Sequence, residues 1–595
     1  YGCESGGDPK NIPDLTYENF LNFHRTYYHP SNSYIYLYGN MDMEEKLAFL
    51  DEHYLSHFDY LDVDSVIQEQ KAFGACRDVT LEYPVAENEG EEDNTYLSYN
   101  MVVGNAADSQ MAMAFEVLDY ALLSAPGAPL KQALLDVKAG KDVYGSYDDG
   151  ILQPYFTVIA KGSNPDRKEE FVSVIRQVLG DIVKNGIDRK AVEAGINYFE
   201  FRYREADFSS YPKGLMYSLD ILGDWLYEKG NPFAQVQQLT VFEKLKKAVN
   251  EGYFEELIRK YLLENPHGCI MTLVPKKGLA AQREKELEEK LEAYRSSLSE
   301  EQLDAMVEKT KALEAYQEAG EDPKALECIP MLKRSDIKRE AAKIINEELT
   351  VDDSLFLYHD VCTNGIGYVD LMFKTDSIAP EQIPYLGLLK SVLGYVDTEN
   401  YTYGELFNEI NANTGGINCG VEVFDRADST EEFQAMFSVR GKALYTKMDF
   451  LFKMIGEILN SSKLEDTKRL YEIVASVKSR AQVNLTGAGH STAVLRAAAY
   501  SSPMAAFQDE MAGIGYYQFI EKLEKDFEQR KEETVEELCK LMKKILRPEN
   551  FMISYTGERE SLETVQKLAG AVKAGLGTEP VEKSEEKLTC TKKNE

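Results

Sequence analysis

Histidine is the residue of this chain that could most readily bind a catalytic metal. There are seven, at positions 24, 29, 53, 57, 267, 359 and 490. Only His53 and His57 have the i, i+4 spacing that would put two imidazoles on one helix face. Zinc hydrolysis needs three protein ligands, an open position for water and a carboxylate that takes a proton from that water. Because no Glu intervenes and no third ligand is evident, we interpret the pair as surface histidines of an amphipathic helix.

Two glycine-rich segments offer no better-defined chemistry. Gly487-Ala-Gly489-His490-Ser491 lacks the Gly-x-Ser-x-Gly pattern of a serine nucleophile, and the chain contains no phosphate-binding Gly-x-x-x-x-Gly-Lys-Ser/Thr motif. Thr414-Gly415-Gly416 could allow a close backbone approach to a substrate. We interpret both segments as structural turns.

The charge balance indicates which partners the chain favours. Asp and Glu number 101 against 66 Lys and Arg, a net charge of -35. This field repels nucleic acid and anionic membranes and attracts basic peptides. The acidic loop Glu87–Asp93 could attract such peptides, although a solvated loop is the simpler interpretation. We find no uninterrupted apolar run near the roughly 18 residues that a membrane-spanning helix requires, so we expect neither nucleic-acid nor membrane partners.

Eight cysteines stand singly at positions 3, 76, 269, 328, 362, 419, 539 and 590. No Cys-x-x-Cys pair or dense disulfide framework is present, which favours a reducing compartment. The cytoplasm is the simplest location, and an organelle matrix is the alternative if a transit peptide has been lost. Cys269, in GCIMTLV, is expected to act as a small buried hydrophobe.

A helix, a Pro/Asn turn and a strand recur three times along the chain. The first copy runs from a helix over Thr16–His29 through HPSN to the strand SYIYLYG (33–39). The second runs from Phe254–Leu263 through ENPHG to CIMTLVP, and the third from Val535–Leu546 through RPEN to FMISYTG. Three copies of one ending predict three copies of one domain.

Two of these copies are preceded by complete interiors with matching order. The earlier one predicts strands at 95–104 and 153–162 and helices at 110–123 and 167–185. The later one predicts strands at 365–376 and 432–442 and helices at 380–393 and 446–460. In both, a further helical stretch precedes the closing element. We therefore expect an α+β fold of repeated sandwich domains, each a mixed sheet packed with helices.

A charged helical segment separates the two complete copies. Residues 279–322 are rich in Glu, Lys, Leu and Ala and contain a single Ser-Leu-Ser-Glu break. We predict an antiparallel helical hairpin in which Ser299 and Gln302 form a capping box. A coiled-coil interaction module is the competing interpretation. The tail after Gly575 is expected to be an extended linker.

Several of these segments resemble the pitrilysin/insulinase superfamily of zinc metallopeptidases, in the branch that contains presequence protease and falcilysin. The segments SGGDP, IPDLTYENF, FH, YYHPSNS and the closing YG resemble the end of its zinc-bearing domain. LVPKKGLAAQREKELEEKLEAY resembles the hairpin that joins the two halves, and TGGINCGVEVF (414–424) resembles the third domain. The resemblance covers most of the chain.

The resemblance implies four homologous domains that close like a clamshell around a chamber for short unstructured peptides. Because the chain opens on Tyr1 without Met, we expect an internal fragment. Its parts would be the tail of the zinc-binding domain (1–70), the second domain (71–275), the hairpin linker (276–345), the third domain (346–575) and a linker to a missing fourth domain (576–595).

The family's zinc ligands, an inverted His-x-x-Glu-His motif and a distant Glu, lie before SGGDP. Its substrate-contacting Arg and Tyr lie in the fourth domain. No catalytic or metal-binding residue is therefore assigned within this chain. Zinc is expected in the full-length protein and not in this fragment, which should be inactive alone.

Three functions remain open from the sequence. The first is the central part of a monomeric zinc metalloendopeptidase that degrades unfolded or basic peptides. The second is a non-catalytic scaffold or partner subunit with the same fold. The third is one subunit of a split enzyme whose zinc domain is a separate polypeptide.

Overall fold

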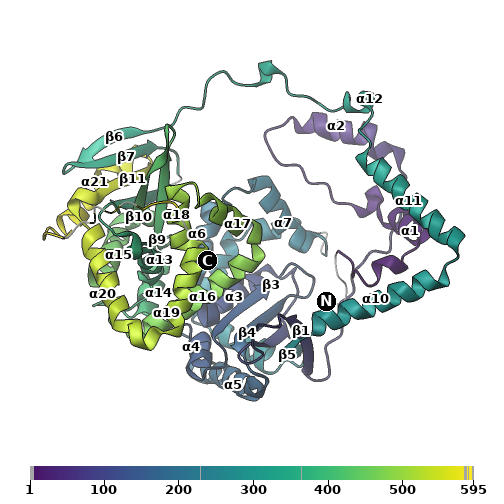
Figure 1. Cartoon of the computed structure of the whole chain (residues 1–595), viewed down its shortest axis with the longest axis horizontal. Coiled ribbons are helices and arrows are strands. Elements are labelled where there is room, and N and C mark those ends of the chain that lie inside the picture. Colours follow the sequence, from purple (N-terminus) through teal and green to yellow (C-terminus); the bar gives the residue numbers. More distant parts are fainter. Residues whose placement is uncertain are drawn as a thin grey trace.

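The computed structural model describes residues 6–227, 230–363, 365–581, 584, 586 and 588–591. Two sheet-containing bodies lie side by side, and helices α1, α2, α10 and α11 stand apart from them (Figure 1). We call the body around strands β1–β5 the first unit and the body around strands β6–β11 the second unit. Within the described residues, none of the helices is both long enough and apolar enough to cross a membrane.

The first unit contains a five-stranded mixed sheet. Its strands are β1 (Arg77–Val85), β2 (Thr95–Val102), β3 (Asp142–Asp148), β4 (Tyr155–Ser163) and β5 (Gly268–Lys277), in the order β1-β5-β2-β4-β3. Only β1 and β5 pair in parallel. Leu97, Tyr99 and Met101 of β2 are buried at every second position, which is the period of a strand with one face on a core.

Helices pack against this sheet and bury its apolar face. They are α3 (Ser109–Asp119), α4 (Pro129–Asp136), α5 (Lys168–Asn185), α6 (Arg189–Glu205), α7 (Lys213–Trp225), α8 (Leu239–Ala248) and α9 (Tyr253–Leu257). In α5, Phe171, Ile175 and Leu179 recur every four residues and are fully buried. Each such side chain contributes roughly 1.5–3 kcal/mol relative to an exposed position.

The second unit repeats the first with one added edge strand. Its strands are β6 (Glu347–Val351), β7 (Ser354–Asp360), β8 (Ile366–Lys374), β9 (Ile417–Arg426), β10 (Ser429–Leu444) and β11 (Phe551–Gly557), in the order β6-β7-β11-β8-β10-β9. As in the first unit, the last strand lies between a parallel partner, β7, and an antiparallel partner, β8. The shared topology confirms that the two complete copies predicted from the sequence have one fold.

The helices of the second unit are more numerous than those of the first. They are α13 (Ile383–Val392), α14 (Tyr403–Asn413), α15 (Met448–Ser461), α16 (Thr467–Gly487), α17 (Gly489–Ala498), α18 (Pro503–Ala512), α19 (Ile514–Lys525), α20 (Phe527–Ile545) and α21 (Leu562–Ala574). The run α17–α19 has no counterpart in the sequence prediction. After α21, the described tail residues are extended, and the Thr591 amide donates to the Ala499 carbonyl at 2.8 Å.

The N-terminal segment differs from the prediction. Helix α1 (Tyr17–Tyr27) and a Pro30–Asn32 turn are present, but residues 33–39 do not form a strand. A strand needs a hydrogen-bonded neighbour, and none pairs with this segment in the described part of the chain. Its aromatic side chains contact α7 instead, with Tyr34 4.6 Å from Trp225 and Tyr38 5.9 Å from Tyr217 between ring centroids.

The charged segment between the units forms two helices, α10 (Leu279–Ser297) and α11 (Glu300–Glu318), followed by α12 (Pro323–Leu326). The predicted capping box is confirmed, since Ser299 and Gln302 exchange both hydrogen bonds. The antiparallel packing is not, because the helices diverge from their turn (Figure 1). Leu291 and Leu313 remain 56% and 54% exposed, so neither helix buries the other's apolar side chains.

Candidate functional site

The two units meet through a tight contact between α6 and α14. The Tyr120 ring stacks with Tyr198 and Phe407 at centroid distances of 5.4 and 6.0 Å. Asn411 of α14 donates to the Tyr120 hydroxyl at 2.7 Å. Burial raises the pKa of Tyr120, so this hydroxyl stays neutral.

A buried ion pair joins the units at the end of α6. Lys442 Nζ of β10 lies 2.6 Å from Glu205 Oε2, and the Glu205 side chain is only 4% exposed. The Tyr368 hydroxyl donates to the same carboxylate at 2.9 Å. Two donors from the second unit therefore satisfy one carboxylate of the first.

Close backbone packing continues this interface. Gly415 lies against Phe201 of α6, where an added Cβ would come within 2.2 Å of the ring. At Gly127, which has a φ of +76°, an added Cβ would lie 3.2 Å from the Tyr403 ring. Thr414-Gly415-Gly416 thus forms the predicted turn, and its close approach is to the other unit.

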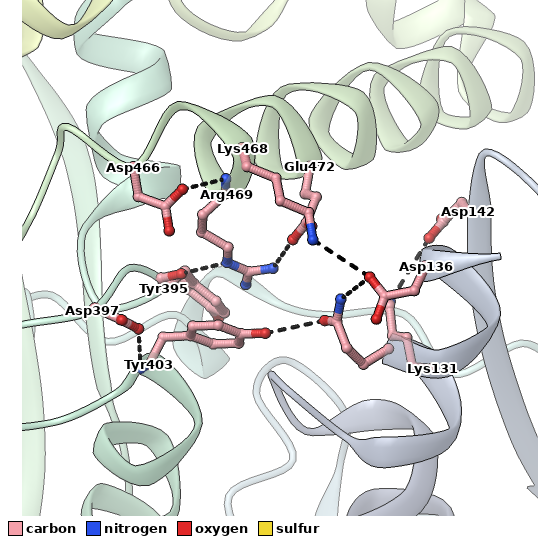
Figure 2. A network of polar contacts seen from close by, with 11 residues as sticks. Lys131, Asp136, Asp142, Tyr395, Asp397, Tyr403, Asp466, Lys468, Arg469 and Glu472 are labelled. Atoms are coloured by element: carbon pink, nitrogen blue, oxygen red, sulfur yellow. Dashed lines mark hydrogen bonds and ion pairs between the residues drawn. The ribbon is translucent and has the colours of Figure 1, made fainter. Parts of the chain in front are cut away.

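A network of polar side chains crosses the interface beside these glycines (Figure 2). The Tyr403 hydroxyl donates to Gln132 Oε1 at 3.1 Å, and Gln132 Nε2 donates to Asp136 at 3.1 Å. Lys468 of α16 reaches Asp136 at 3.5 Å. Side chains of α4 and α16 are thereby brought together although they are more than 300 positions apart in sequence.

Arg469 is the organising cation of this network. Its guanidinium lies 3.9 Å above the centroid of the Tyr403 ring, a cation–π geometry. It also donates to the Tyr395 carbonyl at 3.0 Å and to Glu472 at 2.8 Å (Figure 2). These contacts fix Arg469 and Tyr403 as one wall of a cavity.

That cavity, which we call the interface cavity, has a volume of about 890 Å³ and lies between the units. The first unit contributes residues of α4, β3 and neighbouring loops, and the second contributes residues of α13, α16 and the start of β9. Lys390 of α13 is half-buried in its wall, and burial lowers the pKa of its amine. The interface cavity is the candidate site for a small ligand.

The candidate histidines do not come together on one helix face. Helix α2 (Met43–His53) ends at His53, and His57 lies in a separate short turn, Leu55–His57. The expectation of a shared helix face was wrong because Tyr54 leaves the helical conformation, with φ -138° and ψ -63°. In the residues that the structure describes, no three His, Cys, Asp or Glu side chains group in a manner that could hold a metal ion. These residues do not fit a zinc centre.

The remaining sequence candidates have structural contacts. Gly487 ends α16 and Gly489 begins α17, which confirms the predicted turn. In the acidic loop, the Glu87 carbonyl accepts from Lys277, and Glu91 accepts from the Lys277 amide. Asp93 exchanges hydrogen bonds with Asn164. This loop is therefore anchored to β5 and to the end of β4.

The sequence did not point to Lys390, Arg469 or Glu205. Each lies in a helix with ordinary amphipathic spacing, and the partner that gives it a role belongs to the other unit. A basic run on α16, with Lys468, Arg469, Lys478 and Arg480, was the one available signal.

Two family models match this chain. One, described as "Peptidase M16 inactive domain", matches residues 14–199. The other, which describes the associated region of subfamily C of the same M16 peptidases, matches residues 273–523.

Relatives match over nearly all of the chain. Protein HypA of Clostridium perfringens is 39% identical over 595 residues, all of this chain and 61% of that protein. Presequence protease 1 of Arabidopsis thaliana is 30% identical over 575 residues, 95% of this chain and 53% of that protein. The chain thus spans 53–61% of the length of these two relatives. The crystal structure of pitrilysin aligns with 98% of this chain and 57% of its own at 14% identity and a TM-score of 0.46.

Proposed function

This chain belongs to subfamily C of the M16 pitrilysin peptidases, and on that premise we propose that it forms the wall and hinge of a peptide-degrading chamber in a zinc metalloendopeptidase. The paired sheet units supply the wall. Helices α10 and α11 supply the hinge, since they diverge from one another and bury little of their surface.

The observation that carries this proposal is the nature of the matches. The model that matches residues 14–199 carries the description of an inactive domain, and the other describes an associated region. Two relatives named presequence protease are 30% and 25% identical to the chain over 575 and 577 residues. These matches support a non-catalytic role for these residues within a peptidase.

In this proposal, the zinc ligands belong to a segment outside the 595 residues. Zinc bound there would activate water for peptide hydrolysis. This chain's own contribution would be to enclose and orient the substrate. The buried contacts between the units, Lys442–Glu205 and Asn411–Tyr120, would keep that wall rigid.

The proposed substrates are short unstructured peptides, with basic ones favoured. A net charge of -35 raises the local concentration of cationic peptides. We place the protein in a reducing compartment, the cytoplasm in the simplest case, because its cysteines are scattered singly.

The test compares a longer parent protein that contains this sequence with the 595-residue chain, using a fluorogenic basic peptide. The parent should cleave the peptide, and a chelator should abolish cleavage. The chain alone should not cleave it. Cleavage by the isolated chain would overturn the proposal, and a parent that does not cleave would favour the scaffold alternative.

A further inference from the structure

The interface cavity carries an excess of positive charge in an acidic chain. Eight Lys and Arg side chains line it against five Asp and Glu side chains, whereas the chain as a whole has a net charge of -35. Both units contribute cations, so the excess exists only where they meet. Such a concentration of one sign in a concave site raises the local concentration of the opposite ion.

The excess remains after the ion pairs of the cavity are assigned. Lys131 lies 3.7 Å from Asp142, and Lys468 lies 3.5 Å from Asp136. Lys141 lies 3.5 Å from Asp93. Three further cations of the lining have no carboxylate within ion-pair distance among the described residues: Lys138, Lys390 and Arg480.

Lys390 is the most unusual of these three. It lies on α13, most of whose other residues are buried, and its own side chain is half-buried. The carboxylate that acts on it is Glu422, which already pairs with Arg440 at 3.1 Å. An ammonium withdrawn from water without its own counter-ion is costly, and a bound anion would offset that cost.

The size and walls of the cavity indicate a small ligand. Its volume of about 890 Å³ lies within the range of roughly 300–1,000 Å³ found for small-molecule pockets. Ser391, Ser476 and Asn418 add neutral hydrogen-bonding groups beside the cations, and the Tyr395 and Tyr471 rings add apolar wall.

We propose that the interface cavity binds a small, multiply charged oxyanion, with Lys390 and Arg480 as its principal charged contacts. Phosphate and carboxylate groups share this chemistry, because both accept hydrogen bonds from ammonium and guanidinium groups. A bound anion would contact both units and would strengthen their association. The proposal does not depend on the peptidase function.

The test measures binding of inorganic triphosphate and of citrate to the 595-residue chain by isothermal titration calorimetry at constant ionic strength. At least one anion should bind saturably and more weakly as salt is raised. The double variant Lys390→Met/Arg480→Met should bind it about tenfold more weakly or worse, since hydrogen bonds between charged groups are lost. Saturable binding of triphosphate identifies a phosphate ligand, and saturable binding of citrate alone identifies a carboxylate ligand.

Two controls separate the site from general charge. Lys309→Met removes the same charge from exposed α11 and should leave the affinity unchanged. Lys390→Arg keeps the charge and should retain binding. If the double variant does not fold, Arg480→Met alone tests the same contact, because Arg480 is exposed. The proposal is wrong if neither anion binds, or if the variants at Lys390 and Arg480 bind as tightly as the parent sequence.

Discussion

Lys442 and Glu205 form an ion pair of 2.6 Å that joins the second unit to the first, and the two side chains are 29% and 4% exposed. The Tyr368 hydroxyl provides the other donor to Glu205. Since a carboxylate this deeply buried needs donors, the pair ties α6 of the first unit to β8 and β10 of the second. Separation of the units would leave Glu205 without either donor.

Replacing Lys442 with Met should destabilise the chain by about 3 kcal/mol, because a buried carboxylate loses its counter-ion while the apolar stem is kept. Urea denaturation measures the loss. Lys468→Met is the matched control, since the Lys468–Asp136 pair has side chains 78% and 52% exposed. Pairs this exposed contribute roughly 0–1 kcal/mol. Equal losses in the two variants would contradict the role given to Glu205.

The hydrogen bond between Asn411 and Tyr120 should also stabilise the interface. Tyr120→Phe keeps the ring stack but leaves the buried Asn411 amide without its acceptor, which should cost about 1–3 kcal/mol. Tyr198→Phe removes a hydroxyl from the same stack that accepts a long hydrogen bond of 3.4 Å from Arg202, and it should cost less than about 0.5 kcal/mol. Thermal denaturation of both variants checks this difference.

Glu116 should make stability depend on pH near neutrality. Burial, and then the charges of Asp149 and Asp119, raise the pKa of Glu116 to about 7. An unfolded Glu has a pKa of about 4.3, so the folded state binds the extra proton between these values. Stability from this group is therefore full below a pH of about 4.3 and is lost as pH rises toward 7, by about 3 kcal/mol in total.

The variant Glu116→Gln isolates this effect. Urea denaturation at about pH 5 and at about pH 7.5, on either side of the raised pKa, should show a smaller fall in stability for the variant than for the parent sequence. The exposed Glu251→Gln should change nothing in the pH dependence. If Glu116→Gln falls as steeply as the parent sequence, then Glu116 is not the responsible group.

Local pattern was sufficient to predict much of the fold. The alternation in β2 and the i, i+4 spacing in α5 each mark one buried face, and both elements form as expected. The repeated helix–turn–strand ending correctly predicted that the last strand of each unit plays one role. Edge strand β1 was missed because it is largely exposed and lacks a clear alternation.

The predictions that failed depended on partners that the local sequence does not contain. Residues 33–39 have strand-forming aromatic side chains but no neighbouring strand to pair with in the described chain. The His53–His57 spacing required a helix that continues through Tyr54, which it does not. The interface was not predicted at all, because Glu205 and Lys442 are 237 positions apart and acquire a role only when the units meet.

The most direct test of the central claim is the zinc content of the purified proteins, measured by mass spectrometry of the metal. We expect stoichiometric zinc in a longer parent protein that contains this sequence and none bound to the 595-residue chain after dialysis. Stoichiometric zinc retained by the 595-residue chain alone would contradict the assignment of the zinc ligands to a segment outside it.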